Sequence, residues 1–253
     1  MNDSILTAQE KCALKLRELY ASYGFKFYRM SRFEEYDFYA GKKGFLTAGS
    51  ILTFTDTDGR LMALRPDVTL SIIRSREPGK YYYDEKVYRP KGGSYREISQ
   101  CGIECIPPSE SGEILRLAVM SLHAVSEGRK CAIDVADAGK VSALSPDELK
   151  PEILRCLSAK NIHGLHEINA PSEIIDLASM SGEYPCGLTE YQEEIHTDYS
   201  AVTSLGYYDG IVFKGYIEGI PEAVLSGGQY CVDGVRGAGF AVYIDAVAGV
   251  ERI

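Results

Sequence analysis

Two segments carry polar side chains of the types that hold small charged ligands. In the first, Leu64-Arg65-Pro66-Asp67-Val68-Thr69, the proline fixes a turn and Asp67 follows it at the expected start of a helix. A carboxylate in that position either accepts backbone N–H groups as a helix cap or faces a ligand. Taken alone, the segment favours the cap, because Asp and Thr are common capping residues.

The second segment consists of two strand-like runs, residues 80–88 and 95–105, joined by a basic loop at 89–94. Side chains alternate along a strand, so one face carries a polar series: Arg96, Ile98, Gln100, Gly102 and Glu104. A buried carboxylate is costly without a partner, so this face meets either a ligand or the solvent. The loop is either a phosphate-holding turn or a solvated one.

Two more features lie near the C-terminal end. Tyr207 and Tyr208 begin a predicted strand at 207–216, and adjacent side chains of a strand point to opposite faces. At most one of them would then line a given pocket, and core packing is the alternative for both. Gly227 and Gly228 interrupt another strand pattern, which indicates a bend, a bulge or a ligand close to the backbone.

Composition excludes several classes of protein. The 253 residues are 45% hydrophobic and 25% charged, with a net charge of −9, which argues against a broad electrostatic grip on nucleic acid. No stretch approaches the roughly 20 apolar residues of a membrane span, and the first residues lack the pattern of a signal peptide. Seven scattered cysteines without a CxxC pair predict reduced thiols in a cytoplasmic protein. We expect no metal site, and the four histidines show no catalytic arrangement.

The chain also shows where its elements should lie. Helices are predicted at 8–23 and 109–126, with Ser109 and Glu113 in the first turn of the second one. Asp58-Gly59 predicts a hairpin, and prolines break a helical stretch at about 141–200. Helices and mainly antiparallel strands that do not alternate as βαβ units predict an α+β fold. We expect one domain over 1–253 with a small helical insertion at about 141–200.

Taken in order, five blocks of the sequence resemble the class II histidyl-tRNA synthetases. They are Leu64 to Thr69, Arg89 to Glu104, Gly206 to Phe213, Gly227-Gly228-Gln229-Tyr230 and Ala238-Gly239-Phe240-Ala241. The resemblance implies a dimeric class II aminoacyl-tRNA synthetase-like core, with an antiparallel sheet flanked by helices. The given sequence stops shortly after the last of these blocks, so we expect no anticodon-binding domain.

The same resemblance implies a pocket for histidine. In that family, the acidic residue and threonine of one motif, with a glutamine and a glutamate of another, hold the amino acid. The matching residues are Asp67, Thr69, Gln100 and Glu104, with Tyr207 and Tyr208 near the imidazole and Gly227 and Gly228 beside it. Arg96 either joins this pocket or only neutralises its carboxylates.

Residues that activate the amino acid in that family are replaced here. The ATP-gripping arginine and the glutamate two residues later fall on Lys86 and Tyr88, and two further arginines fall on Thr203 and Ala246. Lysine does not replace arginine at a bidentate phosphate site, and alanine offers no contact. We therefore expect no catalytic residues and no cofactor.

This combination resembles the synthetase paralogues that serve as regulatory subunits of ATP phosphoribosyltransferase. The resemblance implies a homodimer that joins a short catalytic subunit, activates it and takes part in histidine feedback at the first step of histidine biosynthesis. It implies neither tRNA nor a membrane as a partner. Gln229 and Cys231 depart from the paralogues' pattern. Two alternatives stay open: a free-standing histidine or amino-acid sensor, and an amino-acid-activating ligase without a tRNA-binding domain.

Overall fold

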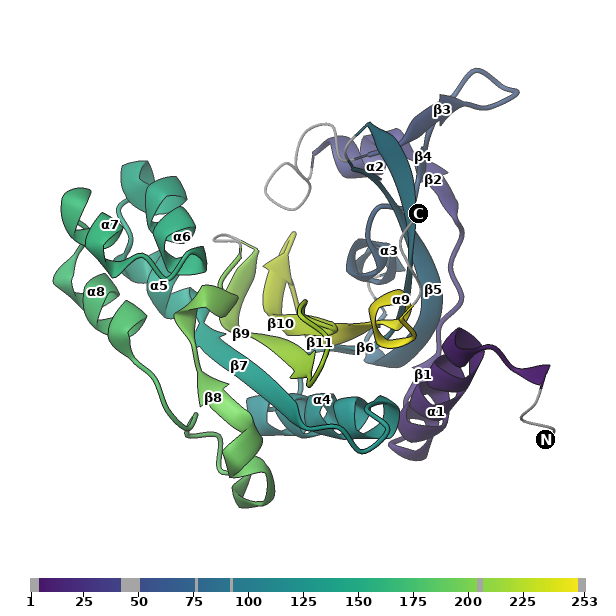
Figure 1. The fold of residues 1–253 in the computed structure, drawn as a ribbon. Helices are drawn as coiled ribbons and strands as arrows, with labels where there is room; N and C mark the ends of the chain where they lie inside the picture. Colours follow the sequence, from purple (N-terminus) through teal and green to yellow (C-terminus); the bar gives the residue numbers. More distant parts are fainter. Residues whose placement is uncertain (1–4, 42–50, 76, 92, 204–206, 250–253) are drawn as a thin grey trace. The chain divides into compact units, whose positions relative to one another are not determined.

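The structure is a computed structural model that describes residues 5–41, 51–75, 77–91, 93–203 and 207–249. The chain forms two compact units (Figure 1). Unit 1 consists of Met1–Ile106 and Ala241–Ile253, and unit 2 consists of Pro107–Phe240. Each unit is described by itself.

The described residues of unit 1 form four helices and two groups of strands. Its elements are α1 (Ala8–Ser22), β1 (Lys26–Phe27), β2 (Phe33–Glu35), α2 (Tyr36–Ala40), β3 (Thr53–Thr55), β4 (Leu61–Leu64), α3 (Val68–Ser75), β5 (Gly79–Lys91), β6 (Ser94–Ile106) and α9 (Ile244–Val247). Strand β5 lies between β1, which is parallel to it, and β6, which is antiparallel. Strands β2, β4 and β3 form a separate antiparallel sheet.

Helix α1 confirms the first predicted helix. Thr7 and Glu10 form a capping box, in which each side chain accepts a hydrogen bond from the other's backbone N–H. Leu16 and Tyr20 are fully buried on the face toward β5 and β6. Gly24 follows the helix at φ 80°, a left-handed conformation that suits glycine.

The hairpin of β5 and β6 is longer than the sequence predicts. Pairing continues from Gly79 opposite Ile106 to Lys91 opposite Ser94. The expected basic loop at 89–94 is therefore wrong for residues 89–91 and for Ser94, which belong to the strands. Pro90 stands near the strand end, where a missing N–H is tolerated. Gly93, at φ 79°, lies in the tight turn that remains.

In unit 2, the residues that the structure describes form five strands with helices packed beside them. Its elements are α4 (Ser111–Val125), β7 (Cys131–Asp137), α5 (Ala138–Leu144), α6 (Lys150–Ser158), α7 (Ile162–Glu167), α8 (Ser172–Ser179), β8 (Ile195–Thr197), β9 (Tyr208–Ile217), β10 (Leu225–Val232) and β11 (Val235–Tyr243), with short 3-10 helices at Asp147–Leu149, Thr189–Glu194 and Tyr199–Ala201. The strand order is β11-β10-β9-β7-β8. Strand β9 is antiparallel to β10 and β7, whereas β8 is parallel to β7.

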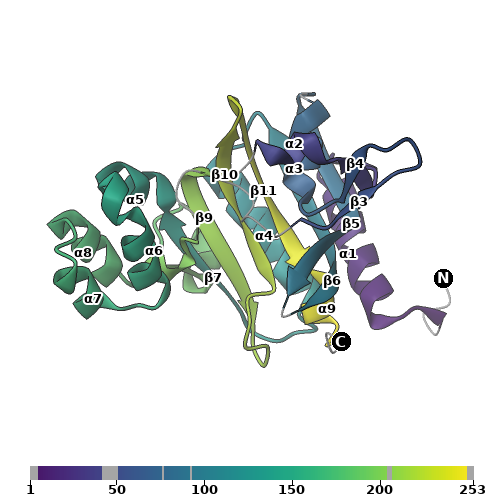
Figure 2. The same cartoon turned by 90° about the horizontal axis from the view of Figure 1, so that it is seen from above.

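Two hydrophobic layers stabilise unit 2. Helix α4, which Figure 2 shows behind the strands, packs on β7, β9 and β10. Its buried residues include Leu117, Ala118 and Leu122. The helix begins later than predicted, after Glu110, so that Glu113 lies in the first turn as expected and Ser109 does not. The other layer gathers α5 to α8 around Ile153 and other buried residues: Leu157, Leu165, Ile174 and Val202.

These elements confirm the α+β class and the helical stretch predicted between 141 and 200. Within the described ranges, no helix is long and apolar enough to cross a membrane. The same ranges contain no cluster of three or more His, Cys, Asp or Glu side chains placed to hold a metal ion.

Candidate functional site

Asp67 serves as the cap of α3 and also meets a cation. Its Oδ1 accepts a hydrogen bond from the backbone N–H of Leu70 at 3.0 Å, which is the capping role. Its Oδ2 lies 3.7 Å from Nη2 of Arg89. Burial raises the pKa of Asp67, and the Arg89 guanidinium opposes that rise. The capping alternative is therefore confirmed, and it leaves the second carboxylate oxygen directed at a charged neighbour.

A second carboxylate lies deeper in unit 1. The hydroxyl of Thr69 donates to Oε1 of Glu104 at 2.5 Å, and Glu104 is only 1% exposed. Burial raises the pKa of Tyr83, and the carboxylates of Glu104 and Asp67 raise it further. We call Asp67, Thr69, Tyr83 and Glu104 the carboxylate cluster. Two carboxylates among buried groups suit a cationic ligand such as an ammonium.

The polar face predicted for β6 is confirmed by its pairing with β5. Residues opposite each other share a face, and the pairs are Arg96 with Arg89, Gln100 with Glu85, and Glu104 with Tyr81. Gln100 is buried, and Nε of Arg96 is buried without a hydrogen-bond partner in the part of the chain that the structure describes. Two arginines directly opposite each other repel, so this end of the face suits an anionic group.

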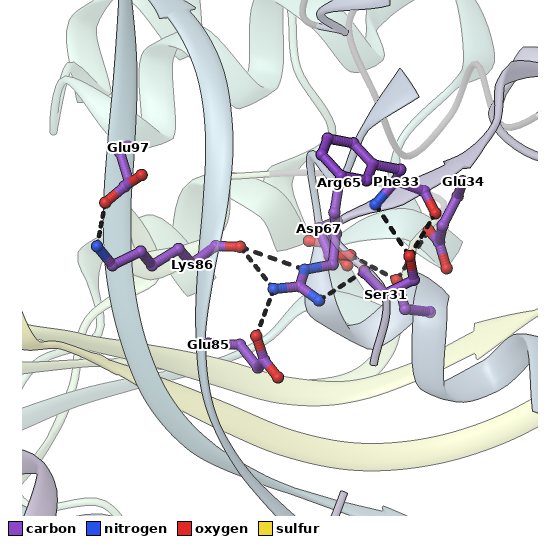
Figure 3. A network of polar contacts seen from close by, with 9 residues as sticks. Ser31, Phe33, Glu34, Arg65, Asp67, Glu85, Lys86 and Glu97 are labelled. Atoms are coloured by element: carbon purple, nitrogen blue, oxygen red, sulfur yellow. Dashed lines mark hydrogen bonds and ion pairs between the residues drawn. The ribbon is translucent and has the colours of Figure 1, made fainter. Parts of the chain in front are cut away.

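Arg65 forms a buried network that the sequence reasoning missed (Figure 3). Its side chain is 0% exposed and donates to the backbone carbonyls of Ser31 and Lys86. Its Nη2 also donates to Oε2 of Glu85 at 2.7 Å. The network ties the segment before α3 to β5, and so it positions the carboxylate cluster. The only signal in the sequence was an arginine directly before Pro66.

Glu34 anchors a second network that the sequence reasoning missed. The hydroxyls of Tyr39 and Ser71 both donate to its Oε2, and the bond from Ser71 is 3.0 Å long. Burial and the Glu34 carboxylate raise the pKa of Tyr39 far above its usual value. These bonds join β2, α2 and α3, so they help to hold α3 in place.

Two replaced synthetase positions of unit 1, Lys86 and Tyr88, lie on the strand face opposite to that of Gln100 and Glu104. Lys86 neighbours Glu85 in β5, so its side chain leaves the opposite face of the strand, where it pairs with Glu97. Figure 3 shows this divergence of Lys86 and Glu85. Tyr88 shares the face of Lys86, and Ala246 lies in α9.

The paired tyrosines of unit 2 correct one expectation. Tyr207 precedes β9, which begins at Tyr208, so the two side chains do not alternate across a strand. Their rings lie 4.3 Å apart between centroids, and Tyr207 also stacks on Tyr230 at 5.5 Å. The prediction that adjacent tyrosines point to opposite faces is therefore wrong here. Thr203, another replaced position, is exposed.

The two glycines of β10 are required by the chain itself. Pairing with β9 shifts between Gly228 and Tyr230, which confirms a bulge. A Cβ at Gly228 would lie 2.5 Å from the carbonyl oxygen of Ile211, and one at Gly227 would overlap the backbone of Gly239. The close approach is thus made by neighbouring strands, and Gly227 and Gly228 need no ligand to explain them.

The site residues therefore fall into two groups, each within one unit. Unit 1 brings together Asp67, Thr69 and Glu104 and places Arg96 and Gln100 on the same strand face as Glu104. Unit 2 brings together Tyr207, Tyr208 and Gly228, since a Cβ at Gly228 would meet the Tyr208 ring.

Comparison with known proteins decides the family. A family model described as histidyl-tRNA synthetase matches residues 3–184 and 183–247, which is most of the chain. The chain belongs to the histidyl-tRNA synthetase family. Among relatives of this synthetase family, the ATP phosphoribosyltransferase regulatory subunit of Lactococcus lactis subsp. cremoris (strain SK11) is 27% identical, in an alignment of 276 positions that covers 91% of this chain and 86% of that protein. The histidine–tRNA ligase of Methanosarcina acetivorans is 26% identical, in an alignment of 284 positions that covers 94% of this chain and 69% of that ligase.

Solved structures confirm the synthetase fold. An ATP phosphoribosyltransferase regulatory subunit/histidyl-tRNA synthetase from Bacillus halodurans matches with a TM-score of 0.80 and 21% identity, over 96% of this chain and 78% of that one. A chain of the ATP phosphoribosyl transferase (HisG:HisZ) complex from Thermotoga maritima matches with a TM-score of 0.71 and 20% identity, over 93% and 97%. The predicted class II synthetase-like core is thereby confirmed.

Proposed function

We propose that this chain is a non-catalytic regulatory subunit of ATP phosphoribosyltransferase. It joins a short catalytic subunit in the cytoplasm and raises the activity of that subunit at the first step of histidine biosynthesis. The Lactococcus relative, which bears this name and matches 91% of the chain, supports the assignment. A second relative with the same name, from Caldanaerobacter subterraneus, is 27% identical and matches 85% of the chain.

The observation that carries the proposal is the direction of Lys86. A synthetase must stabilise the charge that develops on ATP when the amino acid is activated, and preorganised cations at the reacting phosphate do this. Lys86, at the aligned position, lies on the strand face opposite to Gln100 and Glu104 and is paired with Glu97. Thr203 and Ala246 carry no charge at the other two positions. A regulatory role needs none of these cations.

Histidine is the effector that we propose for the carboxylate cluster. Asp67 and Glu104 offer negative charge to an ammonium or a ring N–H, and Thr69 and Gln100 offer neutral hydrogen bonds. Arg96, with its unpartnered Nε, suits the carboxylate of the amino acid. Tyr207, Tyr208, Gly227 and Gly228 of unit 2 stay proposed ligand-binding residues by resemblance.

Reconstitution tests the regulatory role. The full chain is mixed with a short-form catalytic subunit from the same organism, and formation of phosphoribosyl-ATP is followed with and without histidine. We expect activity that rises with the added chain and falls when histidine is present. A catalytic subunit whose rate is unaffected by the chain, and which does not co-elute with it in gel filtration, would contradict the proposal.

Two further measurements separate the alternatives. Pyrophosphate exchange with ATP and each amino acid should stay at the level of a control without protein, whereas exchange with histidine would favour the ligase. Light scattering of the chain alone should give the mass of a homodimer, because class II cores associate through an isologous two-fold contact. Histidine binding without any effect on a catalytic subunit would favour the free-standing sensor.

A further inference from the structure

A pocket of about 240 Å3 lies within the helical part of unit 2 and shares no lining residue with the carboxylate cluster. The end of α6, the start of α7, the end of α8 and the segment after β8 supply its lining. Leu157, Leu165, Ala178 and Met180 give it an apolar part, and Ser179 is one of several hydroxyl groups beside them. Pockets for drug-sized ligands are larger, about 300–1,000 Å3, so this one suits a smaller molecule.

An ion pair stands at this pocket. Nζ of Lys160 lies 2.5 Å from Oδ2 of Asp198, and both residues belong to the lining. The Lys160 side chain is 68% exposed, whereas that of Asp198 is 18% exposed. Asp198 is held in place because its Oδ1 accepts a hydrogen bond from the backbone N–H of Ser200 at 2.9 Å. The pocket thus presents a solvent-exposed cation and a largely buried carboxylate.

The backbone around Lys160 is fixed as well. Lys160 has a φ of 51°, in the left-handed region that glycine adopts most easily. The next residue, Asn161, caps α7 by accepting a hydrogen bond from the backbone N–H of Gly164 at 2.8 Å. The corner between α6 and α7 therefore holds the lysine at the pocket although its backbone there favours a residue without a side chain.

Neighbouring charges balance the pair. Nζ of Lys214 donates to the backbone carbonyl of Ser200 at 3.1 Å. Burial raises the pKa of Asp134, and the Asp198 carboxylate raises it further. His196 of β8 lies beside Asp134 of β7 in the pairing of these two strands. Two lysines thus face two aspartates, and a ligand that brings charges of both signs and no net charge leaves this balance undisturbed.

We propose that this pocket binds a free α-amino acid with an apolar side chain of the size of leucine or methionine. The ammonium group replaces Lys160 at the carboxylate of Asp198, and the freed Lys160 turns to the ligand's carboxylate. The apolar side chain lies against Ile162, Ala178 and Met180, which line the pocket and keep exposed surface. Lys160 and Asp198 each exchange their ionic partner for one charged group of the ligand. The favourable binding free energy therefore comes from burial of the ligand's apolar side chain.

Calorimetry on the full chain tests the assignment with leucine and methionine. The matched controls are 4-methylpentanoic acid, which lacks the ammonium of leucine, and 3-methylbutylamine, which lacks its carboxylate. We expect saturable binding of the amino acids and at least about tenfold weaker binding of both controls. Binding of either control as tight as that of leucine would overturn the zwitterion assignment. No heat at about 10 mM of either amino acid would overturn the proposal as a whole.

Two variants at the pocket and one outside it test the residues. Lys160→Met and Asp198→Asn should each weaken binding by about tenfold or more, because a charge-assisted contact is lost. Lys150→Met removes a comparable ion pair, with Asp147 at 2.6 Å, that lies outside the pocket lining. It should bind like the wild type. Equal binding by all four proteins would overturn the roles of Lys160 and Asp198.

The methionine methyl groups locate the ligand even if a variant fails to fold. The chain has five methionines, of which Met180 lines the pocket and Met62 lies in β4 of unit 1. In a spectrum of 13C-methyl methionine, added leucine should shift the Met180 signal and leave that of Met62 in place. Met180→Leu assigns the signal. A shift of Met62 without one of Met180 would place the ligand in unit 1 and overturn the proposal, whatever the outcome for histidine.

Discussion

Charged side chains are used differently in the two units. In unit 1, Arg65 is completely buried, and its guanidinium is bound by two backbone carbonyls and by Glu85. In unit 2, the Lys160 side chain is mostly exposed and has a carboxylate as its partner. Breaking a buried ion pair leaves an uncompensated charge, whereas an exposed pair exchanges with solvent at little cost. The buried Arg65 network therefore stabilises the fold, whereas the exposed Lys160–Asp198 ion pair suits reversible binding of a ligand.

Replacement of the buried Arg65 should have the largest effect on stability among the variants that test this comparison. Arg65→Met should lower the free energy of unfolding by about 3–5 kcal/mol, because Glu85 and two carbonyls lose a buried partner. Urea unfolding followed by circular dichroism measures it. Arg60→Met is the matched control, since Arg60 pairs with Asp56 in the exposed hairpin and should cost less than about 1 kcal/mol. Equal losses would show that burial does not set the difference.

A substitution in β10 tests whether unit 2 depends instead on close backbone packing. Gly227→Ala should cost about 1–3 kcal/mol or prevent folding, because its Cβ overlaps the backbone of Gly239. Gly112→Ala is the control in the same unit, since its Cβ would meet only the carbonyl oxygen of Cys186 at 3.7 Å. Alanine in helix α4 should be neutral or slightly stabilising. Thermal unfolding of the two variants would contradict us if their order were reversed.

Histidine binding sharpens the role of the carboxylate cluster. Glu104→Gln should weaken histidine binding at least about tenfold, because a charge-assisted contact becomes neutral. Its size and its hydrogen bond with Thr69 are largely preserved. Calorimetry measures the change, and Glu97→Gln serves as the control on the opposite face of β6. If Glu104→Gln binds histidine as well as the wild type does, the cluster is only structural and histidine acts elsewhere.

The smallest effect expected is a pair of opposite pH trends in unit 2. Burial works against ionisation of Asp198, but hydrogen bonds from Lys160 and Ser200 outweigh it and lower its pKa. Its charge therefore stabilises the fold above the unfolded pKa of about 3.9, and that gain is lost as the pH falls. Burial raises the pKa of Asp134, so ionisation of Asp134 lowers the free energy of unfolding at pH values above the unfolded pKa of about 3.9. This loss of stability disappears as the pH falls and the carboxylate is protonated.

Two isosteric variants measure these trends. At pH 7, Asp198→Asn should be less stable than the wild type and Asp134→Asn slightly more stable, each by less than about 1 kcal/mol. Both differences should shrink toward pH 4, which urea unfolding at several pH values would show. The same sign for the two variants at pH 7 would contradict the assigned environments.

The sequence predicted elements where local signals agree with burial. Helix α1 and the hairpin at Asp58-Gly59 follow from period, cap and turn residues, and these act within a few positions of the chain. The polar face of β6 followed from the period of two. The turn at 89–94 was predicted too long, because Arg89, Pro90 and Lys91 are poor strand residues that pair only through their neighbours on β6.

The buried networks could not be predicted because they join distant positions. Arg65 meets Ser31 and Glu85, and Glu34 meets Ser71, so each partner is known only once the fold is. The tyrosine pair failed for a local reason, since Tyr207 precedes the strand that Tyr208 begins. The carboxylate cluster was assigned only through resemblance to a family, because nothing in spacing alone links Thr69 with Glu104.

One link in unit 1 bears on how the protein is made. The buried carboxylate of Asp245 accepts hydrogen bonds from the backbone N–H of Ser99 and from the side chain of Gln9, which is 236 residues away in the chain. During synthesis, α1 and β6 leave the ribosome long before α9, and the whole of unit 2 is made in between. Domains generally fold as units, and contacts of long sequence separation form late. Unit 2 can therefore complete its fold first, while the nascent first hundred residues wait for their last helix and present a natural substrate for chaperones.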